Sequence, residues 1–322
     1  IRRMRFNNTK SLYKIVVALL SFFNTGIAFA QIPNVSHGKI TQIEKFASAY
    51  IQPHTIDIWL PDNYNPVEKY PVLYMQDGKS LFYFGFMLNH QEWDVDKTVQ
   101  QLIDEKKISP CIVVGIWNAD TLRHNEYMPQ KVFNTLTAAQ KDIIYTARRA
   151  NGQLVFRAKE IQSDNYLKFL VKELKPYIDS HFSTLKDQRH TFIAGSSMGG
   201  LISLYAICEY PQVFGGAACL STHWTGIFTE KNNPIPPAVM RYLKNHLPSP
   251  KNHLLYFDYG TATLDTLYKP FQMQANKLLK ARGFTESNLI VKEYPGADHS
   301  EKAWSERLHI PLYFLLKKQT GK

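Results

Sequence analysis

A short stretch around Ser197 combines residue types and spacing suited to nucleophilic chemistry. Residues 191–200 read Thr-Phe-Ile-Ala-Gly-Ser-Ser-Met-Gly-Gly, so Ser197 is the centre of a Gly-x-Ser-x-Gly pattern. An apolar strand pattern precedes it and a helical pattern follows. Such a sharp strand-to-helix turn strains the serine backbone and lifts its Oγ above the sheet, and the glycines leave room for the turn. The helix N-terminus also favours developing negative charge. We therefore predict Ser197 as a nucleophile, with Ser196 as the competing residue.

A serine hydroxyl needs a general base to take its proton. Where a nucleophile lies on this kind of turn, the partners follow in the order serine, acid, histidine. His299 lies in the loop Pro-Gly-Ala-Asp-His-Ser directly after the last expected strand, where the chain can return over the turn. His253 begins an expected strand and His309 lies within the final expected helix. We predict His299 as the base. The histidines that follow Ser197 are His223, His246, His253, His299 and His309.

The acid must orient the imidazole and stabilise its protonated form. The loop after the expected strand 254–257 is the favoured source, and it offers two carboxylates. Asp258 closes the strand, whereas Asp265 lies further along the loop. We predict Asp265 and keep Asp258 as the alternative.

The oxyanion of a tetrahedral intermediate needs two preorganised N–H donors. The residue after the nucleophile, Met198, supplies one. The second is expected from the loop after the strand 70–75, which reads Gln-Asp-Gly-Lys, and we predict the Lys79 backbone N–H. The aromatic run 81–86 that follows suits either a substrate pocket or the core.

Alternating strand and helix patterns must position these residues, as in an α/β protein. Short continuous apolar runs indicate strands covered on both faces, and the first two strands read as an antiparallel pair. We expect a single domain, residues 31–322, whose mostly parallel central sheet has an antiparallel start and helices on both faces. The expected strands are 40–46, 55–60, 70–75, 111–116, 191–194, 216–220, 254–257 and 288–293. The expected helices are 95–107, 167–178, 201–208, 238–246, 271–282 and 301–318, the last bent or restarted at Pro311.

Two segments do not follow the alternation. Residues 129–162 are polar and irregular, and residues 221–250 are rich in Pro and Asn. We expect both to be insertions over the carboxyl edge of the sheet, where a lid or substrate wall would lie.

The first thirty residues have the character of a leader. Five Lys and Arg precede a short apolar run, and Ala-Phe-Ala at 28–30 provides small residues at the positions that a signal peptidase reads. We expect a cleavable signal peptide, cut after Ala30, and a secreted or periplasmic protein. The alternative is a membrane anchor, but the apolar run is interrupted before it reaches the roughly 20 residues that a span requires.

Composition excludes several other classes of function. Residues 31–322 carry 33 Lys and Arg against 27 Asp and Glu, a formal charge of +6, with no long basic run that would indicate nucleic-acid binding. No Cys or His spacing typical of a metal site is present, so no metal and no cofactor are implied. The three Cys lie in apolar contexts and are expected to be buried thiols, with a Cys208–Cys219 bridge as the alternative. Oligomeric state is left open.

The chain resembles the Putative esterase family of α/β-hydrolases, the group of enterochelin esterases, esterase D, feruloyl esterases and mycolyltransferases. The likeness covers nearly all of residues 31–322. Its marks are VLYMQDGKSLF, IVVGIWN followed by RHNEYMP, IAGSSMGG, YFDYGTATLD and YPGADHSEKAWSERL. The resemblance implies an α/β-hydrolase fold with Ser197 as nucleophile, Asp265 as acid and His299 as base. It also implies oxyanion donors at Lys79 and Met198.

These observations lead to the expectation of an exported serine carboxylic-ester hydrolase that works through an acyl-enzyme. Feruloyl or acetyl esters on carbohydrate are the expected substrates. The alternatives are a siderophore esterase, an acyltransferase with the same triad, and a non-catalytic ligand-binding relative.

Overall fold

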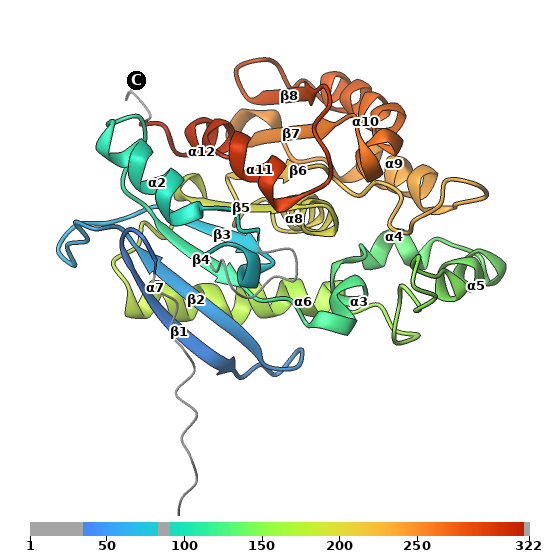
Figure 1. Ribbon diagram of the computed structural model, residues 1–322, viewed down its shortest axis with the longest axis horizontal. Coiled ribbons are helices and arrows are strands. Elements are labelled where there is room, and N and C mark those ends of the chain that lie inside the picture. The colour runs from blue at the N-terminus through green and yellow to red at the C-terminus, as the bar shows by residue number, and fades with distance from the viewer. Residues whose placement is uncertain (1–34, 83–90, 319–322) are drawn as a thin grey trace, which may run out of the picture. The chain divides into compact units, whose positions relative to one another are not determined.

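The computed structural model describes residues 35–82 and 91–318, and within them eight strands form one sheet (Figure 1). The strand order is β1-β2-β4-β3-β5-β6-β7-β8. β2 pairs antiparallel with β1 and with β4, and all other neighbours are parallel. This confirms the predicted mostly parallel sheet with an antiparallel start. The strands are β1 (Lys39–Phe46), β2 (His54–Leu60), β3 (Val72–Gln76), β4 (Ile112–Ile116), β5 (Thr191–Ser196), β6 (Gly216–Leu220), β7 (Leu254–Gly260) and β8 (Leu289–Tyr294).

Helices cover both faces of the sheet, as the sequence predicts. Every residue of β3, β4, β5 and β6 is buried, which explains their continuous apolar runs. Within β3, Val72 and Tyr74 belong to one hydrophobic core, and Leu73 and Met75 belong to the other. Because strand side chains alternate between faces, these two cores are the two sides of the sheet. This confirms the α/β class.

Helices α2 (Val95–Asp104), α11 (Glu301–Arg307) and α12 (His309–Leu316) pack into the core that contains Leu73 and Met75. The remaining larger helices pack into the opposite core: α3 (Arg123–Tyr127), α6 (Ser163–Phe169), α7 (Lys175–His181), α8 (Met198–Glu209), α9 (Ile235–His246) and α10 (Lys269–Arg282). Short 3₁₀ turns lie at η1 (Gly78–Ser80), η2 (Asp120–Leu122), η4 (Gln188–His190), η5 (Pro250–Asn252) and η6 (Thr263–Leu267).

Two predicted helices differ in detail because of proline. The helix expected over 167–178 is made of α6, a π-turn η3 (Leu170–Leu174) and α7. Pro176 near the start of α7 lacks an N–H and would crowd a regular preceding turn, and the wider π-turn accommodates it. The last helix restarts at Leu308, between α11 and α12, and not at Pro311. Pro311 lies in the first turn of α12, where a missing N–H costs nothing.

The first of the two irregular segments contains helices that its composition did not indicate. Residues 129–162 form α4 (Gln130–Asn134) and α5 (Ala138–Thr146), and then a turn closed by a bridge between Arg148 and Leu154. Residues 221–250 contain α9, which confirms the helix expected over 238–246 and begins three residues earlier, and α4 packs against α9. Figure 1 shows these helices together at one end of the molecule.

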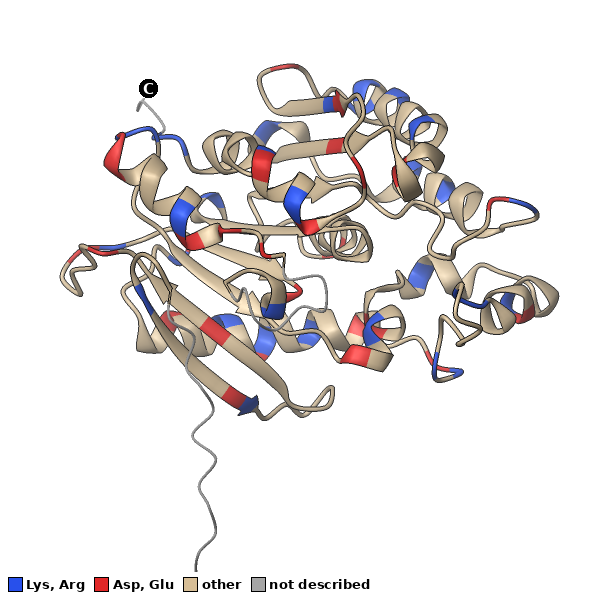
Figure 2. Cartoon of the chain, viewed as in Figure 1, with Lys and Arg blue, Asp and Glu red and all other residues tan. Residues whose placement is uncertain are grey.

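The remaining features concern the leader, the charges and the cysteines. The expected signal peptide, residues 1–30, lies outside the described residues. Within the described part no helix is long and apolar enough to cross a membrane. Figure 2 shows Lys and Arg interspersed with Asp and Glu over most elements. All three Cys are buried and free, so the alternative Cys208–Cys219 bridge is not formed.

Candidate active site

Ser197 lies between the end of β5 and the start of α8, on a strained turn. Its backbone has φ 57° and ψ −125°, a region that residues other than glycine rarely occupy. A Cβ on Gly195 would lie 2.7 Å from the backbone carbonyl of Gly199, so a side chain there would push the turn apart. The Ser197 N–H donates to the Leu220 carbonyl (2.9 Å), which ties the turn to β6. The local sequence thus forms the strained turn that the pattern predicts.

His299 and Asp265 are brought together by the loops that follow β8 and β7. Asp265 lies in η6, and its Oδ1 accepts a hydrogen bond from His299 Nδ1 at 2.5 Å. Its Oδ2 accepts from the Gly260 N–H (2.5 Å) and from Ser221 Oγ (2.6 Å). The His299 N–H donates to Thr263 Oγ1 at 2.9 Å. Three donors therefore hold a carboxylate that is 1% exposed, and the carboxylate in turn orients the imidazole.

Asp258, the alternative acid, has different partners. Its carboxylate forms a buried ion pair with Arg307 of α11, with Nη2 to Oδ1 at 3.1 Å and Nε to Oδ2 at 3.2 Å. It also accepts from Tyr256 Oη at 2.8 Å. Burial raises the pKa of Asp258, and the Arg307 charge opposes that rise. Arg307 Nη2 also donates to Ser221 Oγ (3.0 Å), and the Ser221 N–H donates to Asp258 Oδ1 (3.2 Å), so Asp258 is linked to Asp265 through Ser221 and Arg307 and not directly.

The two predicted oxyanion donors lie on separate turns. Met198 is the first residue of α8, and Lys79 lies in η1, directly after β3. Asp77, at the start of η1, is held in the left-handed region at φ 58°. Its carboxylate accepts two hydrogen bonds from Arg123, at 2.6 and 2.7 Å, and one from Asn118 at 2.7 Å. These charged contacts from the segment after β4 fix the turn that presents the Lys79 backbone.

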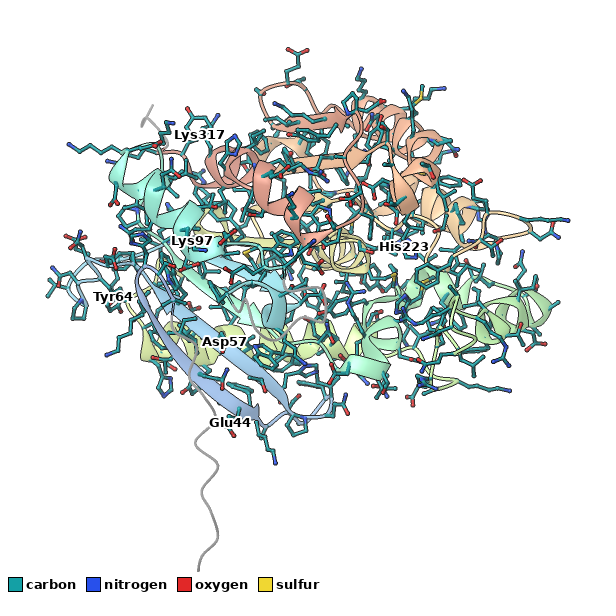
Figure 3. The ribbon with its side chains drawn as sticks, in the orientation of Figure 1. Glu44, Asp57, Tyr64, Lys97, His223 and Lys317 are labelled. Carbon is teal, nitrogen blue, oxygen red and sulfur yellow. The ribbon has the colours of Figure 1, made fainter. Side chains whose placement is uncertain are left out.

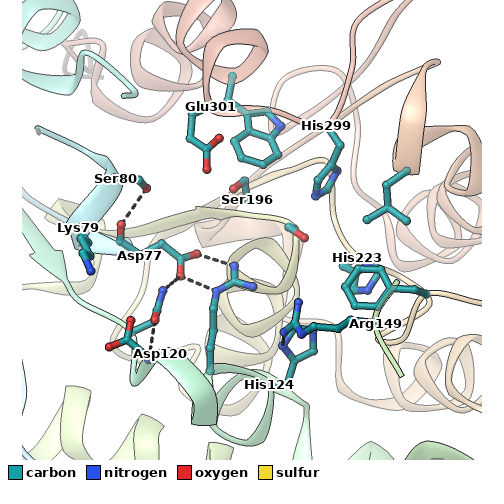
Figure 4. Close-up of a pocket in the computed structure, with 16 residues that line it drawn as sticks. Asp77, Lys79, Ser80, Asp120, His124, Arg149, Ser196, His223, His299 and Glu301 are labelled. Atoms are coloured by element: carbon teal, nitrogen blue, oxygen red, sulfur yellow. Dashed lines mark hydrogen bonds and ion pairs between the residues drawn. The ribbon is translucent and has the colours of Figure 1, made fainter. Parts of the chain in front are cut away.

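Ser197, His299 and Lys79 line one cavity of about 620 Å³ (Figure 4). It opens over the turn that carries Ser197, between the loops that carry His299 and η1. Figure 3 shows His223, another lining residue, between the segment that carries α9 and the segment that carries α4 and α5. The cavity is lined by Asp77, Lys79, Ser80, Asn118, Asp120, Arg123, His124, Arg149, Ser196, Ser197, His223, Phe228, Leu264, His299, Glu301 and Trp304.

Several lining or supporting residues were not predicted. Tyr268 Oη hydrogen-bonds His223 Nδ1 at 2.7 Å. Burial raises the pKa of Tyr268 well above its usual value, and a hydrogen bond with the Ser197 side chain opposes that rise. Trp304 of α11 donates from Nε1 to Ser221 Oγ (3.0 Å), and its ring meets the His299 ring edge-to-face at 4.9 Å. Only tertiary contacts bring these residues to the site, so no local sequence pattern indicates them.

Part of the predicted aromatic run belongs to the core. Leu81 and Phe82 are buried against the sheet, whereas residues 83–86 lie outside the described part of the chain. The described aromatic wall of the cavity comes instead from Phe228 and Trp304.

Comparison with known proteins supports the same assignment of fold and family. Residues 48–313 match the model of the family described as Putative esterase. Among curated proteins, the chain is 28% identical over 202 residues to an endo-1,4-beta-xylanase/feruloyl esterase of Xylanibacter ruminicola, covering 60% of this chain and 23% of that protein. The chain spans 60% and 23% of the length of two of the curated relatives it matches, and 92% of a third.

Two solved structures share the fold at low identity. A ferulic acid esterase is 16% identical with a TM-score of 0.61, covering 87% of this chain and 98% of that chain. The ferric enterobactin esterase from Salmonella typhimurium is 19% identical with a TM-score of 0.59, covering 88% of this chain and 60% of that chain. Both likenesses extend over most of the sheet and its helices, and they show the α/β-hydrolase fold.

Proposed function

The chain belongs to the Putative esterase family and is a carboxylic ester hydrolase, and we propose that it cleaves its ester through an acyl-enzyme on Ser197. One observation carries this proposal. Ser197, on its strained turn, and His299 line the same cavity, and Asp265 is hydrogen-bonded to His299. A nucleophile, a base and an orienting acid are the three groups that acyl transfer needs.

The first half-reaction forms the acyl-enzyme. His299 Nδ1 donates to Asp265, so Nε2 of the neutral ring accepts the proton from Ser197 Oγ as that oxygen bonds to the ester carbonyl carbon. The backbone N–H groups of Met198 and Lys79 stabilise the resulting oxyanion. The intermediate then collapses, the bond to the alcohol oxygen breaks, and His299 returns the proton to the departing alcohol.

The second half-reaction regenerates the serine. A water molecule attacks the acyl carbon while His299 Nε2 takes one of its protons. The bond between the carbonyl carbon and Ser197 Oγ breaks, and the proton passes to that oxygen. The products are the alcohol, the carboxylic acid and the free enzyme.

We propose feruloyl or acetyl esters on carbohydrate as substrates of an exported enzyme. A curated relative is described as a xylanase/feruloyl esterase and one solved structure as a ferulic acid esterase. Phe228 and Trp304 supply the aromatic surface that such an acyl group would contact. The basic leader and the Ala-Phe-Ala sequence before Gln31 support export.

A siderophore lactone is the second candidate. A solved structure with the same fold is a ferric enterobactin esterase, and the cavity is lined by Arg149, which suits an anionic ligand. The two candidates differ in the group that would occupy the cavity, and a substrate panel separates them.

The test compares methyl ferulate, acetylated xylan and a catecholate trilactone as substrates of the chain and of Ser197→Ala. We expect the unsubstituted chain to hydrolyse methyl ferulate or acetylated xylan, and we expect Ser197→Ala to hydrolyse neither. Preferential cleavage of the trilactone would instead establish the second candidate. Equal rates with and without Ser197 would remove this serine from the mechanism.

A further inference from the structure

The two segments that interrupt the sheet alternation meet at one end of the cavity. Arg149 comes from the segment 129–162, and His223 and Phe228 come from the segment 221–250. The Arg149 guanidinium lies 5.4 Å from the centroid of the Phe228 ring, and the His223 ring lies 5.4 Å from the same ring. His124 of α3 completes the group, at 6.1 Å from Phe228. We call Arg149, His124, His223 and Phe228 the Arg149 cluster.

The charge of Arg149 is not neutralised by an acidic side chain. Its Nη2 donates to His124 Nδ1 at 3.1 Å, and no carboxylate of the described residues forms an ion pair with it. The segments outside the described residues contain no Asp or Glu. In contrast, the neighbouring Arg123 is held by both oxygens of Asp77. Burial, followed by repulsion from Arg123 and Arg157, lowers the pKa of Arg149, and the charge of a bound anion would oppose that shift.

The two histidines of the cluster carry buried nitrogen atoms without partners. Because an arginine can only donate, His124 Nδ1 accepts from Arg149, and the neutral ring therefore carries its proton on Nε2. Burial, with repulsion from Arg123, keeps the pKa of His124 well below its usual value, so the ring is neutral at pH 7. Nε2 of His124 and Nε2 of His223 have no hydrogen-bond partner among the described residues. Both histidine residues are at least 97% buried, a depth at which polar atoms are normally hydrogen-bonded.

Charges are separated across the cavity. Figure 4 shows Asp77, Asp120 and Glu301 together with Lys79 on one side, and Arg149 with the two histidines on the other. All three carboxylates among the described lining residues are therefore on the side away from Arg149. A ligand with one anionic end would therefore bind in a single orientation, with that end toward Arg149.

We propose that the Arg149 cluster is a carboxylate subsite, so that the preferred ester substrates carry a free carboxylate away from the bond that is cleaved. A planar carboxylate matches the two parallel N–H groups of a guanidinium, and Phe228 packs against the guanidinium and limits its rotation. His124 and His223 line the cavity on the same side as Arg149. This inference names a substrate class for the proposed esterase and rests on that proposed function, but its first test does not require catalysis.

The first test measures binding to a protein that cannot turn over. The Ser197→Ala protein is titrated with 4-acetoxybenzoate and with its uncharged isostere 4-acetoxybenzamide. The double variant that carries both Ser197→Ala and Arg149→Gln is titrated with the same two compounds. We expect the benzoate to bind about 10- to 100-fold more tightly than the amide, as a charge-assisted hydrogen-bond pair requires. Arg149→Gln should remove that difference in affinity. Arg149→Lys should keep part of it, because lysine retains the positive charge but lacks the two parallel N–H groups of a guanidinium. Equal affinities before Arg149 is changed, or a difference that persists in Arg149→Gln, would overturn the proposal.

The second test measures hydrolysis of the same pair, together with p-nitrophenyl hemiglutarate and p-nitrophenyl valerate, which place the carboxylate on the acyl side. We expect the ratio of kcat/KM for anionic over neutral ester to exceed about tenfold in at least one pair and to fall in Arg149→Gln. Arg148→Gln is the matched control, since Arg148 is exposed, bonds to the Gly152 carbonyl and does not line the cavity. It should keep the ratio.

The two tests separate the possible failures. Hydrolysis of the neutral esters without preference for an anionic partner would support the esterase and overturn the subsite. Selective binding of the benzoate without hydrolysis of any ester would support the subsite and contradict the proposed function.

Discussion

Replacing Asp265 with asparagine should stop catalysis while preserving the shape of the site. Oδ2 of Asp265 accepts from Ser221 Oγ and from the Gly260 N–H, and Oδ1 accepts from His299 Nδ1. Because the Gly260 N–H can only donate, the asparagine oxygen must take the place of Oδ2, and its NH₂ group then faces His299. His299 Nδ1 is forced to accept, so the ring proton moves to Nε2. A protonated Nε2 cannot take the proton of Ser197.

The expected loss of catalytic rate is large, because the His299 tautomer with its proton on Nε2 replaces the one with its proton on Nδ1. A wrong tautomer of this kind lowers kcat about 10⁴-fold, which corresponds to about 5 kcal/mol in the activation free energy. The free energy of unfolding should change by only about 1–2 kcal/mol, since two of the three hydrogen bonds to the side chain are kept and the third, to His299, reverses its direction and loses its charge. Initial rates with p-nitrophenyl acetate and urea unfolding of the same Asp265→Asn preparation give the two quantities.

Asp258→Asn is the matched control, and it should have the opposite phenotype. It leaves Arg307 as an uncompensated buried charge, which typically costs about 3–5 kcal/mol of stability. Activity per folded molecule should fall far less than in Asp265→Asn, because the Asp258 carboxylate is bonded to Ser221 and Arg307 and not to His299. The reasoning is refuted if Asp258→Asn loses more activity per folded molecule, or if Asp265→Asn stays within tenfold of the unsubstituted chain.

Two further predictions concern the support of the site and its pH dependence. Ser221→Ala removes the hydroxyl that donates to Asp265 and accepts from Trp304 Nε1 and Arg307 Nη2. We expect this variant to lose about tenfold in kcat/KM and about 1–3 kcal/mol in the free energy of unfolding. The control variant Ser203→Ala loses only a hydrogen bond to the Gly199 carbonyl and should keep its activity. For stability, burial lowers the pKa of His223 well below 6.5, so the unfolded chain binds a proton that the folded protein does not. The His223 contribution is therefore fully present above pH 6.5 and is lost as the pH falls below it, by about 1.4 kcal/mol per pH unit. Urea unfolding between pH 4.5 and 7.5 should show a correspondingly smaller slope in His223→Asn, and an unchanged slope would contradict this.

Local patterns were sufficient to predict the sheet and the turn at Ser197. The strands have continuous apolar runs because helices cover both faces, and such runs differ clearly from their surroundings. The strained turn depends on residues adjacent in sequence, since Gly195 and Gly199 meet across it. These features depend on short-range chemistry, and the structure agrees with their prediction.

Local patterns favoured Asp265 over Asp258 only by its place in the loop, and they did not find helices α4 and α5 or Arg149. Both carboxylates follow β7, and the difference between them is made by Arg307, which arrives from a helix 49 residues later. Helices α4 and α5 are short and polar on much of their surface, so their periodicity is weak. Arg149 reaches the cavity only because the turn closed by Arg148 and Leu154 folds toward it.

The most direct test of the central claim is to trap the acyl-enzyme. The chain is mixed with p-nitrophenyl acetate, quenched in acid during the burst and digested, and the peptides are sequenced by mass spectrometry. We predict one acetyl group on the peptide that contains Ser197, located on that residue and not on Ser196, and none in Ser197→Ala. Turnover with no acetyl group on Ser197, or with an equal yield on Ser196, would contradict the account.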